Sequence, residues 1–509
     1  MFPILRGCVR LYCNREVLTQ SCVKPFHAMH SEINHTIVRL ISELCRAGVR
    51  YCHWKSNEAL AKSASGENDL DLLVCRDDLT IFREVLMKLG LKLARSSGFR
   101  NVPGIEDYYG YDESTGLIFH VHAHYRLVVG HDASKSIVLP IEKAYIASAR
   151  LLDGQIMPTP AVEMEFIVFC LRMVLKFTLF GALRGRPLLG AGARREYEWL
   201  GQRVNMARVR ELQATHLPMI SSSLFESCIS SVAGDTGIIK RGRTYWRLRR
   251  ALRGCERMGV LQEVWRRQSL RAMQLVSRLR RKPLLSERGL AGGGLVIAIV
   301  GGDGSGKSSA IGHLAAWLGG NFKVTQLHMG KPPRRFSTLQ MDAFSRITSL
   351  ARRGEVQLAH RGLVRYLHMF RSVLYARDRY YCHKDGHRKA LHGDVVICDR
   401  HYLPFVQSMD GAECERLGGP SPDRICRWLT RLEHGYLARI MPPHVLLHLA
   451  VPPELAVARK TTEDAAYVRE RNERIMMNAE LRKTAWVIDA SADRDSVCRE
   501  LRKVVWGKL

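Results

Sequence analysis

The pattern of hydrophobic and polar positions divides the chain into three regions. From about residue 31 to 150, helical patterns alternate with short β-rich runs, among them "DLDLLV" (69–74) and "GLIFHVHAHYRLVV" (116–129). From about 155 to 285, apolar residues recur at helical spacing and no strand is predicted. Beyond residue 290, apolar runs of four to eight residues alternate with helical stretches. This last pattern predicts a parallel sheet with helices on both faces.

We therefore predict an α/β protein of several domains, because 509 residues exceed what one hydrophobic core usually organises. Residues 1–30 form a segment whose order the pattern leaves open, and 31–150 form an α+β domain. Residues 151–290 form a basic helical region that ends in the linker "RKPLLSERGLAGGG" (281–294), and 291–509 form the parallel-sheet domain.

The most hydrophobic run, "FIVFCLRMVLKFTLFGAL" (166–183), carries Arg172 and Lys176 in its middle. A spanning helix needs about twenty apolar residues with few charges, so we predict a buried or interfacial helix. The N-terminal residues do not resemble a secretory leader, and the 14 scattered cysteines indicate reduced thiols. We expect a cytoplasmic protein, with peripheral membrane contact left open.

The net charge is strongly positive: 78 Lys+Arg against 49 Asp+Glu leave +29, which favours anionic partners. Residues 240–282 hold 15 of these basic residues and two acidic ones, interleaved with Trp and Leu. Three interpretations remain open for this basic run. It is a solvated helical face, a contact with an anionic membrane surface, or, less favoured, a nucleic-acid contact.

A phosphate-binding pattern, Gly301-x-x-x-x-Gly306-Lys307-Ser308, lies between the predicted strand "LVIAIV" and the predicted helix "SSAIGHLAAWL". Backbone N–H groups of such a loop converge on phosphate oxygens at a helix N-terminus. We expect Lys307 to reach the β- and γ-phosphates of ATP and Ser308 to ligate Mg²⁺. The expected nucleotide-binding residues of the loop are Gly301, Gly302, Asp303, Gly304, Ser305, Gly306, Lys307, Ser308 and Ser309.

An acidic residue outside the loop suits the same site. "GDVVICDRHYLPF" places Asp399 and Arg400 at the carboxyl end of a predicted strand, where ligands bind in open α/β sheets. We expect Asp399 to hold the metal ion or its water, and Arg400 to face an anionic acceptor.

Together these segments resemble the thymidylate kinases, which are P-loop nucleoside monophosphate kinases. The resemblance covers 295–509 and rests on "GGDGSGKSS", "LYARDRYYCH" (374–383), "VVICDRH" and "PPHVLLHLAVPPELAVARK" (442–460). It implies that Asp303 contacts the acceptor sugar and that Arg379 and Arg400 hold the acceptor phosphate. It also implies a lid whose basic residues close over the transferring group: Arg459, Lys460, Arg469 or Arg471.

Two segments depart from the family pattern where it reads the base. "HMGKPPRR" (328–335) replaces the family's Arg-Glu-Pro-Gly-Gly, and "SMDG" (408–411) replaces its Ala-Tyr-Gln-Gly. The changed polar residues in these two segments indicate a different phosphorylated acceptor or relaxed specificity.

The 31–150 region has its own candidate site in "YCHWKSNEALAKSASGENDLDLLV" (51–74). Asp69 and Asp71 alternate along a strand, so their carboxylates share a face and suit a divalent metal. With Lys55-Ser56 before them they resemble the nucleotidyltransferase superfamily, although Lys55 stands where that family has Gly. The family's third acid is expected in "LIFHVHAHYRL", which offers only histidines.

These histidines, His120, His122 and His124, share one face of their strand and are either metal ligands or the polar face of a half-buried strand.

We expect an enzyme that transfers a phosphoryl group from Mg·ATP to a nucleoside monophosphate or related phosphorylated molecule. By analogy alone, the fusion suggests a link to cell-surface polysaccharide synthesis. Two alternatives stay open: nucleotidyl transfer at Asp69 and Asp71, and a non-enzymatic ATP-gated protein that binds membrane or nucleic acid.

Overall fold

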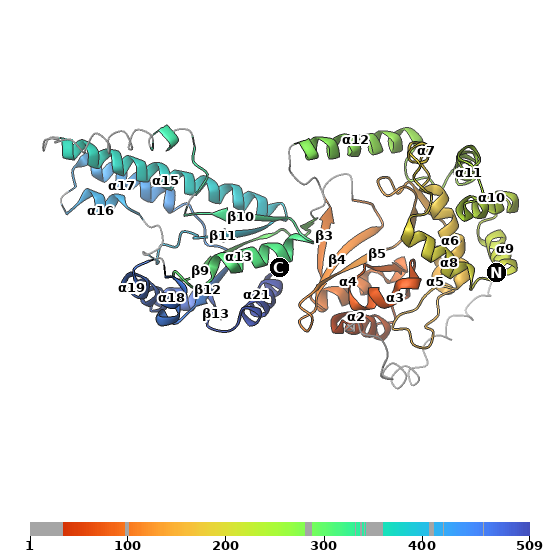
Figure 1. Ribbon diagram of the computed structural model, residues 1–509, viewed down its shortest axis with the longest axis horizontal. Helices are drawn as coiled ribbons and strands as arrows, with labels where there is room; N and C mark the ends of the chain where they lie inside the picture. The colour runs from red at the N-terminus through yellow and green to blue at the C-terminus, as the bar shows by residue number, and fades with distance from the viewer. Residues whose placement is uncertain are drawn as a thin grey trace, which may run out of the picture. The chain divides into compact units, whose positions relative to one another are not determined.

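Contacts between residues divide the chain into two units. The N-terminal unit comprises 1–91 and 99–282, and the C-terminal unit comprises 92–98 and 283–509. In this computed structural model the described residues are 34–96, 101–279, 288–330, 332–335, 338–340, 342, 360–406, 412–420, 422–461 and 463–509. Parallel and mixed sheets packed with helices confirm the predicted α/β class (Figure 1).

The N-terminal unit begins with a sheet and continues into helices. Its elements are α2 (His35–Arg46), β1 (Tyr51–His53), η1 (Asn57–Ala59), α3 (Leu60–Ser65), β2 (Leu70–Val74), η2 (Arg76–Asp78), α4 (Leu79–Lys88), β4 (Ile105–Tyr111), β5 (Ile118–His124), β6 (Leu127–Val129), β7 (Ile137–Leu139), α5 (Glu142–Ala147), α6 (Val162–Leu175), α7 (Leu179–Leu183), α8 (Ala191–Gly201), α9 (Met206–His216), α10 (Ser222–Ala233), α11 (Ile238–Ala251) and α12 (Val260–Leu279).

The sheet of this unit runs in the order β1-β2-β5-β4, and only the β2–β5 pair is parallel. Alternation along β5 separates its two faces. Phe119, Val121 and Ala123 are fully buried on one face, and the intervening histidines lie on the other. The apolar face thus anchors the strand and fixes where the polar face points.

Helix α6 is the centre of the helical part. The buried helix predicted for 166–183 is confirmed up to Leu175, while residues 179–183 form the separate helix α7, none of whose residues is buried. Every residue from Met164 to Leu175 is buried, including Glu165 and Arg172. Helices α8, α9, α10 and α11 pack around it. Among the described residues, no helix combines the length and apolar character needed to cross a bilayer.

The C-terminal unit contains the following elements: β3 (Lys92–Ser96), β8 (Arg288–Leu290), β9 (Leu295–Val300), α13 (Lys307–Gly319), β10 (Val324–His328), α15 (His360–Leu391), β11 (Val395–Asp399), α16 (Cys414–Gly418), α17 (Arg424–Leu437), β12 (Val445–Ala450), α18 (Pro453–Arg459), α19 (Ala465–Met476), α20 (Ala479–Thr484), β13 (Trp486–Asp489) and α21 (Arg494–Lys508).

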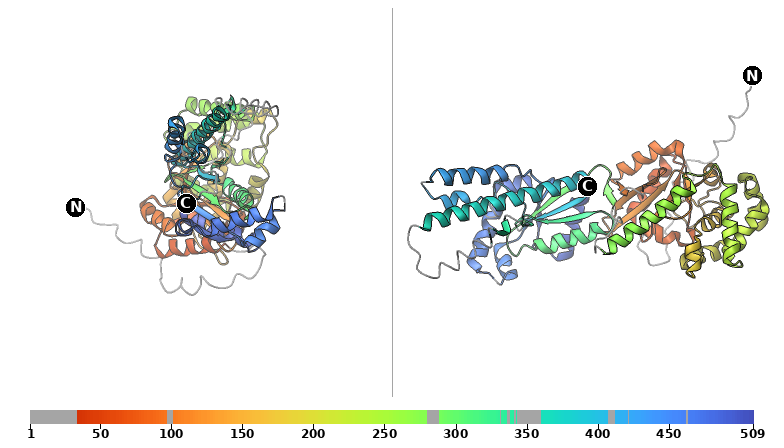
Figure 2. Two further views of the ribbon diagram at one scale, coloured as in Figure 1. Left: turned by 90° about the vertical axis from the view of Figure 1, so that its left-hand side faces the viewer. Right: turned by 90° about the horizontal axis from the view of Figure 1, so that it is seen from above.

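Its sheet is parallel throughout, in the order β10-β11-β9-β12-β13. After β9 the chain forms β10 and β11 on one side of that strand, and later β12 and β13 on its other side. The direction in which strands are added therefore reverses beside the central strand β9. Helices α13 and α21 cover one face and α15 covers the opposite face (Figures 1 and 2). The carboxyl ends of β9, β11 and β12 therefore meet where ligands bind in open sheets of this kind.

The prediction of a linker over 281–294 is wrong at residues 288–290. Residues 288–290 form β8, which pairs antiparallel with β3. A Cβ atom on Gly289 would lie 3.1 Å from the carbonyl oxygen of His392. Glycine here serves a close backbone approach, which composition alone cannot distinguish from linker flexibility.

Candidate functional site

The glycine-rich loop follows the fully buried strand β9 and leads directly into α13. Gly304 and Gly306 adopt left-handed conformations, with φ of 79° and 85°. A side chain on Gly304 would also meet the carbonyl oxygen of Ala456 at 2.5 Å. Both positions therefore need glycine, one for its backbone angle alone and one for angle and space.

Helix α19 holds this loop through two consecutive residues. Arg471 Nη1 lies 2.8 Å from Asp303 Oδ2. Asn472 Nδ2 donates to the backbone oxygen of Asp303 at 3.1 Å and to that of Val468 at 2.9 Å. Asn472 is buried and packs so closely on Gly302 that no side chain fits there.

Sequence reasoning missed Asn472. It could have been found as a polar residue at helical spacing between apolar ones, because Val468, Asn472 and Ile475 form the buried face of α19.

Lys307, the first residue of α13, curls back onto its own loop. Its Nζ donates to the carbonyl oxygens of Gly301 at 2.9 Å and Gly302 at 2.6 Å. Burial lowers the pKa of Lys307 to about 8, and the charge of Asp303 opposes this shift. A half-buried ammonium whose hydrogen-bond acceptors within the described residues are neutral carbonyl oxygens is a strong potential partner for an anion.

Asp399 ends β11 beside the loop. In the parallel register it pairs with Ile299 of β9 on one side and His328 of β10 on the other. His328 Nε2 lies 3.5 Å from Asp399 Oδ2. Asp399 Oδ1 is buried and has no hydrogen-bond partner within the described part of the chain. This orphaned oxygen fits a cation or its water as a partner.

Arg400 and Arg379 are the residues expected to hold the acceptor phosphate. Arg400 follows Asp399 with φ of 53°, a left-handed angle that costs energy for a residue with a side chain. Its charge and that of Asp399 are both felt by Lys307. Arg379 lies on α15, and its Nε donates to the carbonyl oxygen of Met329 at 3.3 Å, just beyond β10. These contacts put Arg379 and Arg400 at the carboxyl edge of the sheet.

The other predicted loop residues differ in exposure. Ser308 and Ser309 are exposed in the first turn of α13. Ser305 is buried, and its hydroxyl has no partner among the described residues.

The predicted lid residues do not act together. Only Arg471 contacts the loop. Arg459 Nη1 instead donates to the carbonyl oxygen of Ala490 at 2.8 Å, and Arg469 is exposed on α19. That Arg459 closes over the transferring group stays a prediction; in this structure its guanidinium donates to a backbone carbonyl beyond β13. Residues 408–411, which were expected to replace a base reader, lie outside the described residues.

A second polar cluster lies on the N-terminal sheet. Asp71 on β2 and Asp107 on β4 both pair in register with His122 of β5, which lies between them. His120 contacts Asp69 through Nδ1 and Asp107 through Nε2, both at 2.9 Å. Asp107 is thus a third carboxylate on the face that Asp69 and Asp71 share. The sequence prediction missed it because it sought this acid on the histidine-bearing strand.

Lys55 and Ser56 form the turn beside this cluster. Ser56, and not Lys55, takes the left-handed conformation, with φ of 57°. Lys55 Nζ lies 2.9 Å from Asp71 Oδ1. Burial opposes ionisation of Asp71, but the charge of Lys55 and a hydrogen bond from His122 together keep its pKa well below the ordinary value. Lys55 therefore acts as the counter-ion of Asp71.

Asp71, His122 and His124 could also hold a metal ion, since one ligand atom from each lies within 4.8 Å of the others. Burial lowers the pKa of both histidines, so both offer neutral nitrogen donors. Two nitrogens and one oxygen suit a transition metal better than Mg²⁺. A metal ion here competes with Lys55 for Asp71.

No protein-family model matches this chain, and none of the curated proteins matches it with significant similarity.

Proposed function

We propose that the C-terminal unit transfers a phosphoryl group from Mg·ATP to a phosphorylated small molecule, in the manner of the thymidylate kinase-like class. The observation that carries the proposal is the convergence of Lys307, the glycine-rich loop and the orphaned Asp399 carboxylate at the carboxyl edge of β9 and β11. An amine and turned backbone N–H groups bind phosphates. A neighbouring carboxylate and the Ser308 hydroxyl are oxygen donors, which Mg²⁺ prefers.

In this mechanism Lys307 leaves the carbonyl oxygens of Gly301 and Gly302 and takes phosphate oxygens as its partners. Asp399 and Ser308 would hold Mg²⁺, which would supply charge neutralisation on the phosphate oxygens. Arg379 and Arg400 orient the anionic acceptor from the sheet edge. The protein contributes positioning and electrostatic stabilisation and forms no covalent intermediate.

The test is release of ADP from Mg·ATP by the full chain in the presence of thymidylate, other nucleoside monophosphates or sugar phosphates. Lys307→Ala should lower turnover by on the order of 100-fold or more, in line with the loss of a charge-stabilising group. Lys483→Ala, which changes an exposed lysine on α20, should leave it unchanged. Acceptor-independent hydrolysis, or a rate equal in both variants, contradicts the proposal. Turnover of sugar phosphates alone would favour the link to polysaccharide synthesis.

We propose nucleotidyl transfer at the N-terminal cluster as a second function, supported by the third carboxylate, Asp107. The required event is displacement of Lys55 from Asp71 by metal-bound nucleotide phosphates. Pyrophosphate release from the four nucleoside triphosphates, with Mg²⁺ or Mn²⁺, tests it. Asp71→Asn and Asp107→Asn should each abolish release, while Asp132→Asn, an exposed position in the loop before β7, should not. Release that survives in both carboxylate variants assigns the activity elsewhere.

A further inference from the structure

Helix α12 presents its apolar residues to solvent. Six large apolar side chains on it are more than 40% exposed, with Leu261 at 86%, Trp265 at 64% and Leu279 at 77%. At 100° per residue all six fall within about 120° of the helix circumference. We call this set the apolar stripe; its members are Leu261, Val264, Trp265, Leu275, Val276 and Leu279.

The opposite side of α12 packs on the protein, and of the α12 residues whose burial is described, the charged Glu263 is the most buried. Glu263 is 2% exposed and accepts hydrogen bonds from Ser134 Oγ at 2.7 Å, Arg249 and Arg267. A surface helix ordinarily buries its apolar face and exposes its polar one. On α12 the most exposed residues are apolar and the most buried one is charged, and an ion-pair network around Glu263 holds the helix in place.

The charge around the stripe has one sign. Residues 240–282 carry 15 basic residues and two acidic ones, which leaves +13. Both acidic residues are engaged within the unit: Glu256 pairs with Arg249, and Glu263 pairs with Arg249 and Arg267. No acidic side chain of this run is therefore left to balance the arginines around it.

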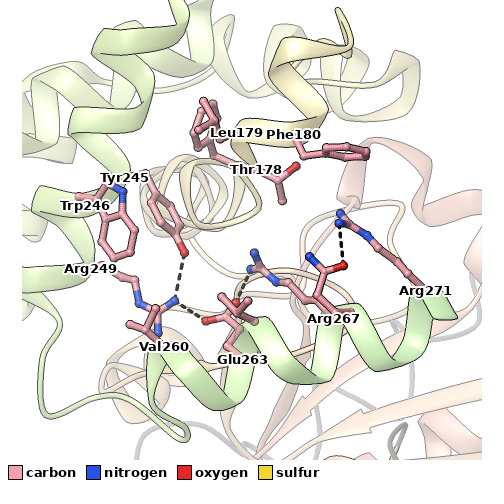
Figure 3. A pocket seen from close by; sticks show the side chains of 13 residues that line it. Thr178, Leu179, Phe180, Tyr245, Trp246, Arg249, Val260, Glu263, Arg267 and Arg271 are labelled. Carbon is pink, nitrogen blue, oxygen red and sulfur yellow. Dashed lines mark hydrogen bonds and ion pairs between the residues drawn. The ribbon is translucent and has the colours of Figure 1, made fainter. Parts of the chain in front are cut away.

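A cavity of about 320 Å³ adjoins the stripe, between α7, α11 and α12 (Figure 3). Trp246, Val264 and Arg271 line it, and Arg271 lies over the ring of Phe180 at 4.9 Å. On α7, Leu179, Phe180 and Leu183 are also exposed. Aromatic rings beside guanidinium groups suit the boundary between lipid headgroups and acyl chains.

We propose that α12, with the adjoining parts of α7 and α11, binds the surface of an anionic lipid bilayer. The helix is about 30 Å long and lies in the plane of the interface, with the apolar stripe inserted and the arginines at headgroup level. Nucleic acid would match the charge but leaves the Leu and Val side chains exposed. A second copy of this chain would cover the apolar stripe, but it would bring two surfaces of net charge +13 together. Only an anionic bilayer satisfies both features, and this inference is independent of the proposed phosphotransferase.

Vesicle co-sedimentation of the full chain tests the proposal. With vesicles of phosphatidylcholine containing 30% phosphatidylglycerol we expect binding, and with pure phosphatidylcholine at least tenfold weaker binding. Raising the salt to 0.5 M should weaken the binding further, because surface charges are screened. Equal binding to neutral vesicles, or none to anionic ones, overturns the proposal.

Two substitutions on the stripe separate lipid insertion from charge attraction alone. Leu261→Ser and Leu275→Ser together should reduce binding to anionic vesicles at least tenfold, while Met87→Ser, an equally exposed position on α4, should not. All three side chains are exposed, so the variants should keep the circular dichroism and melting temperature of the parent. Unchanged vesicle binding by the double variant overturns insertion of the stripe.

Tryptophan fluorescence reports the depth of contact. Brominated anionic lipids should quench the parent chain. Trp265→Phe combined with Trp246→Phe should lose most of that quenching, while Trp428→Phe of the C-terminal unit should keep it. The same variants are then examined for duplex DNA binding by fluorescence anisotropy and for self-association by sedimentation. Tight DNA binding without lipid binding, or a stripe-dependent dimer without lipid binding, assigns the surface to that other occupant and refutes the proposal.

Discussion

The contact between the glycine-rich loop and α19 predicts a steric coupling that can be measured without knowing any substrate. A Cβ atom on Gly302 would lie 1.7 Å from Asn472 Oδ1 and 2.3 Å from its Cγ. Ordinary contacts need about 3.4 Å or more, so Gly302→Ala must push the Asn472 side chain out of its buried position. Asn472 then loses the hydrogen bonds to the carbonyl oxygens of Asp303 and Val468.

The magnitude follows from those two bonds. Each contributes about 1 kcal/mol net, and an amide left buried without partners costs about 1–3 kcal/mol. We expect Gly302→Ala to destabilise the C-terminal unit by about 2–3 kcal/mol. For a unit of this size that corresponds to a fall in its melting temperature of roughly 5–10 °C.

Differential scanning calorimetry of the full chain measures this shift, and hydrogen exchange over 465–476 locates it. Asn472→Ala removes the atoms that clash, so the double variant should be no less stable than Asn472→Ala alone, a coupling of about 2 kcal/mol. Gly312→Ala is the control, because Gly312 lies on α13 with open space around it and should gain up to about 1 kcal/mol. Additive losses in the double variant, or an unshifted transition for Gly302→Ala, would refute the steric argument.

Three further predictions concern ionisable groups. Because the Lys307 pKa lies at about 8, ATP affinity measured by calorimetry should fall by up to about tenfold per pH unit from pH 8 to 9.5, and a Lys307→Met variant should show no such fall. Lys55→Met leaves the Asp71 carboxylate without its cation, and urea unfolding at pH 7 should show a loss of about 1–3 kcal/mol, against no loss for the exposed Lys62→Met. Burial raises the pKa of Glu165 to about 8, so the native state binds the extra proton and stability falls as the pH rises from about 4.5 to 8. Glu165→Gln should flatten that part of the melting-temperature profile, and an unchanged slope would contradict the assignment.

What the sequence could predict was local. The strand β9, the loop and α13 follow each other without interruption, so a hydrophobic run and a glycine pattern suffice to identify them. Asp399 was predictable for the same reason, because it ends a buried strand. The buried character of α6 also followed from its composition, despite Glu165 and Arg172.

The third carboxylate of the N-terminal cluster could not be predicted in this way. Asp107 joins Asp71 beside His122 only because β4 pairs antiparallel and β2 pairs parallel with the same strand, in registers that align both residues with His122. A shift of one residue in either register would turn the carboxylate to the other face. The packing of the whole sheet sets that register, and no local pattern contains it.

The lid arginines show why basic residues near a phosphate loop are weak evidence in a chain with a net charge of +29. The resemblance to the thymidylate kinases implies a role for Asp303 with the acceptor and a separate role for Arg471 with the transferring group. In the folded unit the two form an ion pair at 2.8 Å, and Asn472 ties the same helix to the loop backbone. In this structure each of these two side chains is a partner of the other. Phosphate binding by Arg471 would therefore compete with Asp303, and the Gly302–Asn472 coupling measures how tightly α19 is held against the loop.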